Sequence, residues 1–128
     1  MIFEELPEYN KDFKNLLKKY RSLNEDIKIV KKILGSLPNE RPFSYRIDNL
    51  GLETCTIKIK KIACKSLKGK GVNSGLRLVY AHFDKMEEIE QDGEIIRTES
   101  REKIVLVELY HINNKTIEDR DRIKRHFK

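Results

Sequence analysis

The chain has 128 residues, of which 38% are hydrophobic and 38% charged, and its formal net charge is +6. This length fits a single domain, residues 1–128, and is too short for two domains with a cleft between them. The composition excludes a disordered chain, and no apolar run approaches the roughly 20 residues that span a bilayer. The N-terminus lacks the basic-then-apolar pattern of a secretory signal, so we expect a cytoplasmic protein.

Two amphipathic helices are predicted over residues 9–37, after a short strand at residues 2–4. Apolar side chains recur at helical spacing in both segments, with charged residues between them. Asn24 is a suitable cap for the second helix, and Pro38 ends it. We therefore expect a helical hairpin whose apolar stripes pack on a core.

Strand-type sequence follows Pro42, where the apolar period changes to two. The predicted strands are residues 43–47, 56–64, 76–83 and 104–112. Between the last two lies an acidic stretch with Asp92-Gly93 at its centre, a dipeptide that favours a two-residue turn, so we expect a hairpin extension at about residues 84–103.

The C-terminal segment from Thr116 has its acidic residues early and its basic residues late, which matches the dipole of a helix. The order of elements predicts an α+β fold: an N-terminal helical hairpin packed on a small antiparallel sheet, with a C-terminal helix.

Positive charge is concentrated between Thr54 and Phe83, a segment without a single acidic residue. Its seven basic residues are Lys58, Lys60, Lys61, Lys65, Lys68, Lys70 and Arg77. A concentrated basic surface attracts polyanions such as nucleic acids. Lysines also keep sheet edges soluble and unpaired, and charge alone does not decide between the two interpretations.

The two cysteines, Cys55 and Cys64, are not accompanied by a cluster of histidine and carboxylate residues. Two thiols alone do not make a metal site, so we expect reduced cysteines, no metal and no cofactor.

Two motifs connect the basic segment to a known family. Residues 75–80 read Gly-Leu-Arg-Leu-Val-Tyr, and the last predicted strand ends in Tyr110-His111 before a charged helix with the sequence EDRDRIK. This combination resembles the RelE/ParE superfamily of type II toxin-antitoxin toxins, from about Lys58 onward and excluding the acidic hairpin. A departure from the family is Ile112, which stands where relatives often carry lysine.

The resemblance implies a RelE-like fold, with two N-terminal helices packed on a small antiparallel sheet. It also implies a metal-independent endoribonuclease that cleaves messenger RNA at the ribosome, inhibits translation and is silenced by a cognate antitoxin protein. A related branch poisons gyrase, which the Tyr-His turn disfavours. A third interpretation is a basic module that binds nucleic acid or a partner without catalysis.

Arg77 and His111 are the catalytic candidates. RNA cleavage without a metal needs proton transfer and stabilisation of extra charge on the phosphoryl group. A guanidinium binds phosphate oxygens through two hydrogen bonds, which suits Arg77, although a strand arginine also commonly pairs with a carboxylate such as Glu108. His111 is the candidate general acid or base, although a lone histidine at a strand end is more often structural.

Several lysines are candidates for binding the RNA backbone. Lys68 and Lys70 flank Gly69 in a loop that can approach a phosphate closely. Lys65 precedes this loop, and Lys115 follows the Tyr-His turn.

Three further residues are candidates for a supporting role in the site, and each also has a structural interpretation. Asp119 orients a basic partner or caps the last helix. Tyr80 and Tyr110 stack on bases or pack inward.

Overall fold

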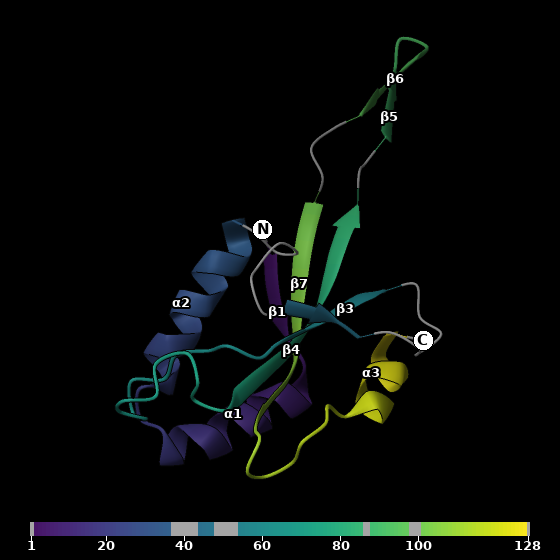
Figure 1. Cartoon of the computed structure of the whole chain (residues 1–128). Helices are drawn as coiled ribbons and strands as arrows, with labels where there is room; N and C mark the ends of the chain where they lie inside the picture. Colours follow the sequence, from purple (N-terminus) through teal and green to yellow (C-terminus); the bar gives the residue numbers. More distant parts are fainter. Residues whose placement is uncertain (1, 37–43, 48–53, 86–87, 98–100, 128) are drawn as a thin grey trace.

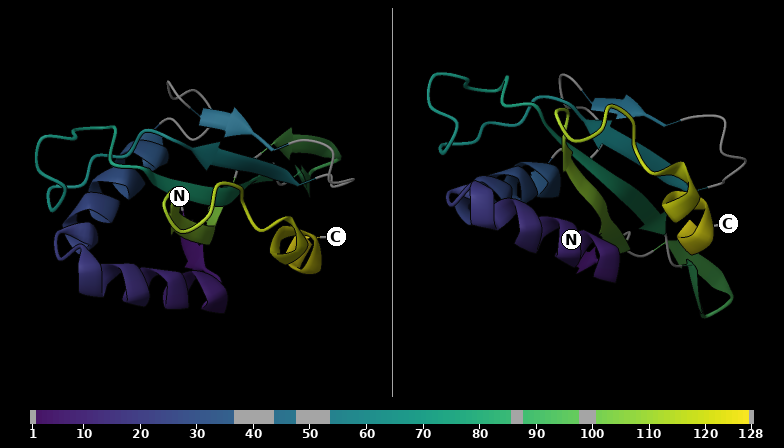
Figure 2. Two further views of the ribbon diagram at one scale, coloured as in Figure 1. Left: turned by 60° about the horizontal axis from the view of Figure 1, so that its bottom comes forward. Right: turned by 90° about the horizontal axis from the view of Figure 1, so that it is seen from below.

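A five-stranded sheet forms the centre of the molecule, with two helices on one face and a third helix on the other (Figures 1 and 2). The structure is a computed structural model, and it describes residues 2–36, 44–47, 54–85, 88–97 and 101–127. The elements are β1 (Ile2–Glu5), α1 (Pro7–Lys19), α2 (Leu23–Ser36), β2 (Ser44–Arg46), β3 (Cys55–Ile59), β4 (Leu76–Lys85), β5 (Glu88–Gln91), β6 (Glu94–Arg97), β7 (Arg101–His111) and α3 (Arg120–Phe127).

The strand order in the sheet is β1-β7-β4-β3-β2. β1 runs parallel to β7, and the other neighbours are antiparallel. The predicted α+β architecture, with an N-terminal helix pair, a mostly antiparallel sheet and a C-terminal helix, is therefore confirmed. No helix in the described part of the chain has the length and apolarity needed to cross a bilayer.

The acidic stretch forms the predicted hairpin. β5 and β6 pair antiparallel as a separate two-stranded sheet that projects beyond the main sheet (Figure 1). Asp92 and Gly93 join them with φ angles of 54° and 78°, the conformation that a primed turn requires. The Asp-Gly signal thus located this turn correctly.

The two N-terminal helices begin slightly earlier than their sequence patterns suggest. α1 starts at Pro7, since proline is tolerated in a first turn where its missing N–H has no acceptor to bond. α2 starts at Leu23, so Asn24 lies inside the first turn and does not cap the helix. Ser22, immediately before α2, instead binds Asp26 through its hydroxyl at 2.7 Å.

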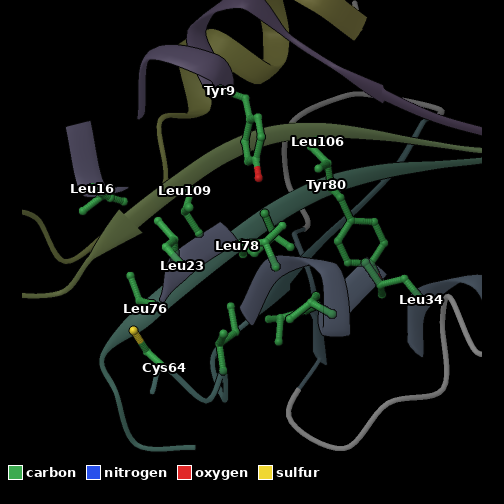
Figure 3. Close-up of a cluster of buried hydrophobic side chains, with 14 of the residues drawn as sticks. Tyr9, Leu16, Leu23, Leu34, Cys64, Leu76, Leu78, Tyr80, Leu106 and Leu109 are labelled. Atoms are coloured by element: carbon green, nitrogen blue, oxygen red, sulfur yellow. The ribbon is translucent and has the colours of Figure 1, made fainter. Parts of the chain in front are cut away.

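Each face of the sheet carries its own hydrophobic cluster. The larger one lies beneath α1 and α2 and includes Leu76, Leu78 and Tyr80 of β4 (Figure 3). The alternate residues Val79 and Ala81 belong to the cluster beneath α3. This alternation, with period two, decides on which face every side chain of β4 lies.

α3 is held against the sheet by its N-terminal cap and by one arginine. Asp119 precedes the helix and accepts a hydrogen bond from the backbone N–H of Arg122 at 3.0 Å. The guanidinium of Arg122 donates to Asp12 of α1 at 2.7 Å and to the carbonyl of Val107 at 3.0 Å. These contacts tie the last helix to both α1 and β7.

Candidate nucleic-acid interface

Arg77 and His111, the two expected catalytic residues, lie on opposite faces of the sheet. In the β4–β7 register Arg77 is opposite Tyr110, and His111 is opposite Leu76. Opposed residues of an antiparallel pair project to the same face. Leu76 belongs to the cluster under the helical hairpin and Tyr110 to the cluster under α3, so the expected catalytic pair is not brought together.

His111 has both ring nitrogens engaged in the turn that follows β7. Its Nε2 lies 2.8 Å from the carbonyl oxygen of Ser74, and its Nδ1 accepts the backbone N–H of Asn113 at 3.1 Å. A carbonyl only accepts, so Nε2 carries the proton and the ring is neutral. The ring is 6% exposed and stacks on Tyr20. This geometry fits a structural clamp better than proton transfer to a substrate.

Arg77 lies half-buried at the start of β4, on the face that α3 partly covers. Its Nη1 donates to the carbonyl oxygens of Lys60, at 2.7 Å, and Leu76, at 3.2 Å. No carboxylate among the described residues pairs with its guanidinium. Glu108, the expected partner under the structural interpretation, pairs with Lys115 instead.

Two buried carboxylates near Arg77 are neutralised by lysines. Glu108 and Glu118 are 1% and 5% exposed. Glu108 also accepts the backbone N–H of Asp119 at 2.8 Å, while Glu118 binds Lys58 at 2.7 Å. The lysines therefore satisfy both acids, and the charge of Arg77 stays uncompensated by any described carboxylate.

The pairing of Glu108 with Lys115 and of Glu118 with Lys58 changes the role of both lysines. Lys115, a predicted phosphate-binding residue, is engaged with a buried carboxylate and also lies over the ring of Tyr110 at 5.1 Å. Lys58 is similarly held, with 15% of its side chain exposed. Both lysines stabilise the fold on this face and are less available to RNA than their exposed neighbours.

Of the two roles expected for Tyr80 and Tyr110, stacking on bases or packing inward, the structure shows inward packing, because both rings are buried. Tyr80 is 0% exposed and Tyr110 is 4% exposed, which leaves no open ring face. Burial, then the charges of Glu118 and Glu108, raise the pKa of Tyr110 to about 12, against the opposing effect of Arg77. In the β4–β7 register Tyr110 is opposite Arg77, and Glu108 lies two residues before Tyr110 on the same strand.

Of the two roles that the sequence allowed for Asp119, orienting a basic partner or capping the last helix, the structure shows the cap. It caps α3, and its carboxylate lies 3.8 Å from the Nε of Arg122. Its role is thus to hold the helix.

Tyr45 is the exposed aromatic residue that sequence reasoning missed as a site residue. It lies on β2 opposite Lys58, which in turn is opposite Val79, so its side chain is on the same face as Arg77. The ring is 47% exposed, and the Nζ of Lys60 lies 4.6 Å from its centroid. This face therefore presents an aromatic ring on β2, a lysine immediately after β3 and an arginine on β4.

The basic loop, residues 60–75, is anchored to the start of α2. Ser22 and Ser66 exchange two hydrogen bonds of 2.8 Å between backbone N–H groups and hydroxyls. Asp26 accepts the backbone N–H of Lys65 at 3.4 Å. Leu67 packs against the larger core cluster, so residues 65–67 anchor the loop immediately before Lys68 and Lys70.

Lys65, Lys68 and Lys70 project from this loop with exposed side chains. No carboxylate among the described residues pairs with them. Gly69 and Gly71 have φ angles of 77° and 55°, which lets the backbone turn tightly between the lysines. The interpretation that these lysines protect a sheet edge does not fit, because they lie outside the strands, and β3 is an inner strand.

Metal chemistry has no ready ligand set in the described part of the chain, where no three histidine, cysteine or acidic residues gather. Cys55 and Cys64 are free thiols. Burial raises the pKa of the Cys64 thiol, which therefore stays protonated and packs as part of the core.

The Lys58–Glu118 pair makes stability depend on pH. Burial raises the pKa of Glu118, but the hydrogen bond and charge of Lys58, helped by Arg120, outweigh burial and hold the pKa below its ordinary value of 4.5. A carboxyl group whose pKa is lower in the folded state stabilises the fold at pH values above its ordinary pKa. This stabilisation is lost as the pH falls through the folded-state pKa.

Lys58→Met should lower the free energy of unfolding by about 3 kcal/mol at pH 7, because the buried Glu118 loses its closer cation and keeps only the more exposed Arg120, at 3.2 Å. The loss should shrink towards pH 4, where burial favours the protonated form of Glu118 once Lys58 is absent. Urea denaturation at both pH values measures this, with Lys28→Met as the control, since Lys28 makes an exposed pair with Glu25. An equal loss at both pH values would contradict the assignment.

Comparison with family models, with curated proteins and with solved structures finds no match to this chain.

Proposed function

We propose that this protein is a toxin of the RelE/ParE superfamily, a cytoplasmic endoribonuclease that binds messenger RNA at the ribosome and inhibits translation until an antitoxin covers it. One observation carries the proposal: the guanidinium of Arg77 has no carboxylate partner among the described residues, although two buried acids lie close by and are paired with lysines. A cation left uncompensated beside an exposed aromatic ring and a basic loop suits the phosphate backbone of RNA.

Each part of this surface has a distinct role under the proposal. Arg77 binds the scissile phosphate and stabilises the charge that develops on it, since its Nη1 is oriented by two carbonyl groups. Lys65, Lys68 and Lys70 bind neighbouring phosphates. His111 positions the turn after β7 and exchanges no proton with RNA, because both its nitrogens are engaged. The 2′-hydroxyl proton therefore passes to solvent water, and water protonates the leaving 5′-oxygen.

A non-catalytic RNA-binding module is the second candidate function. The separation of Arg77 and His111 on opposite faces favours it, because it removes the expected acid or base from the phosphate-binding face. Such a module would bind RNA with a steep salt dependence and release no cleavage products at any salt concentration.

Purified protein incubated with ribosomes on a defined message distinguishes the candidates. We expect cleavage without added metal, together with growth arrest on expression. Binding without cleavage would select the second candidate. DNA damage with intact translation would point to the gyrase-directed branch, and the absence of RNA binding, cleavage and growth arrest would overturn the proposal.

Tyr45→Ala should weaken binding of single-stranded RNA by about tenfold, because stacking on an exposed ring contributes about 1–3 kcal/mol per base. Tyr45→Phe keeps the ring and should bind like the wild type. Fluorescence anisotropy with a labelled oligonucleotide measures both. If the two variants bind equally well, the ring does not stack on RNA.

A further inference from the structure

Apart from Lys19 in the last turn, the charged residues of α1 are segregated between two sides of the helix. Its acids face inward: Glu8 binds His126 at 2.9 Å, and Asp12 binds Arg122 at 2.7 Å. Three lysines, Lys11, Lys14 and Lys18, are exposed on the outer side. None of the three pairs with a carboxylate in the part of the chain that the structure describes.

α2 provides a contrast that argues against an ordinary solvated face. There Lys28 pairs with Glu25 at 3.5 Å, and Lys31 pairs with Glu5 of β1 at 2.9 Å. Lysines on a solvated helix are commonly balanced in this way by nearby acids. The lysines of α1 instead form a row of a single sign, which raises the local positive potential.

The lysine row borders a hollow in the surface. The hollow has a volume of about 580 Å³ and is lined by Lys11, Lys14, Asn15, Leu17 and Lys18. Positions separated by three and four residues share one side of a helix, and the row spans about 10 Å at 1.5 Å per residue. The cations are therefore arranged in a line on a rigid element, beside a shallow and largely open depression.

This row continues towards the basic loop. α1 ends at Lys19, and two residues after Tyr20 the chain reaches Ser22, which binds Ser66 of the loop. In Figure 2 the loop lies beside the junction of the two helices in both views. Cations on α1 and on the loop thus border one end of the molecule.

We propose that the outer side of α1, with Lys11, Lys14 and Lys18, binds the phosphate backbone of double-stranded RNA. The inference rests on the proposed function, and it adds a second contact distinct from the Arg77 face. Lysines act as point charges and read no base, and the aromatic side chain on this helix nearest to them, Phe13, packs against the core. Duplex RNA, which proteins recognise mainly through phosphates and 2′-hydroxyls, needs no exposed aromatic ring.

Binding of two labelled RNAs to the full chain tests this inference: a duplex of about 16 base pairs and a single strand of about 12 nucleotides. The test variant carries Lys11→Gln, Lys14→Gln and Lys18→Gln. The control carries Lys28→Gln, Lys31→Gln and Lys32→Gln on α2, which changes the net charge by the same amount. The single strand carries 2′-O-methyl groups, which block cleavage, whereas the duplex keeps the 2′-hydroxyls through which duplex RNA is recognised.

We expect the α1 variant to bind the duplex about 10- to 100-fold more weakly at moderate salt, and to lower the slope of log affinity against log salt by about 3. The single strand should bind within about threefold of wild type. The α2 control should bind both RNAs like wild type.

Equal effects of the two triple variants on the duplex would overturn the inference, as would an acidic polypeptide that competes better than duplex of the same charge. Wild-type protein that binds the single strand but not the duplex would overturn it and leave the proposed function intact. Failure to bind either RNA would overturn both.

Discussion

Replacing Arg77 with alanine should lower RNA cleavage by about 10²- to 10³-fold, the usual effect of removing one preorganised group that stabilises charge in a transition state. The guanidinium is oriented by the carbonyls of Lys60 and Leu76, so it meets the phosphate without reorganising. Primer extension on ribosome-bound message measures the rate, and growth after induced expression gives the corresponding effect in cells.

Two further variants identify the cause of that loss. Arg77→Lys keeps the charge but loses the bidentate hydrogen bonding of the guanidinium, so it should recover only part of the activity. Arg125→Ala removes an exposed arginine that pairs with Glu8, and it should cleave like wild type. Arg77→Ala should cost only about 1 kcal/mol of stability, because a half-exposed side chain is lost. Full activity of Arg77→Ala in a folded protein would exclude Arg77 from the site.

The fold could be predicted from local patterns, because each pattern acts within one element. The change of apolar period after Pro42 separated helices from strands, and Asp92-Gly93 located the turn of the projecting hairpin. The boundaries were less accurate, because a capping side chain decides them. The last helix begins at Arg120 and not near Thr116, since Asp119 provides the cap.

The site was harder to predict, because it depends on register between strands far apart in sequence. One motif contains Arg77 and the other contains His111, and each shows which residues of its own strand lie on the same face. Only the pairing of Arg77 with Tyr110 shows that His111 projects to the other face. The sequence carries no local signal for this register, and an irregularity between Val79 and Tyr80 shifts it within the same pair of strands.

Tyr45 was missed for a related reason. Tyr45 and Ile47 share one face of their segment, and the alternation alone does not distinguish a buried residue of that face from an exposed one. Ile47 is 8% exposed and joins the cluster beneath α3, whereas Tyr45 is 47% exposed. The cluster that Ile47 joins contains Ile123 of α3, which is distant in sequence, and no local pattern shows that Ile47 and not Tyr45 belongs to it.

Gly75→Ala should destabilise the fold by about 3 kcal/mol, combining strain at a positive φ with overpacking of a buried site. Gly75 has a φ of 87°, and a Cβ added there would lie 2.7 Å from the Nε2 of His111. The ring cannot easily retreat, because it is bonded to the carbonyl of Ser74 and stacked on Tyr20. Chemical denaturation measures the loss.

Gly35→Ala is the matched control, because the same methyl group is added where nothing lies within 4 Å. Gly35 is in α2, and alanine is favoured over glycine in a helix by about 0.5–1 kcal/mol, so this variant should be more stable than wild type. Opposite signs for the two substitutions would support His111 as a structural clamp of the turn. If Gly75→Ala were as stable as wild type, the turn would tolerate displacement of His111, and a mobile histidine would again be a candidate for proton transfer.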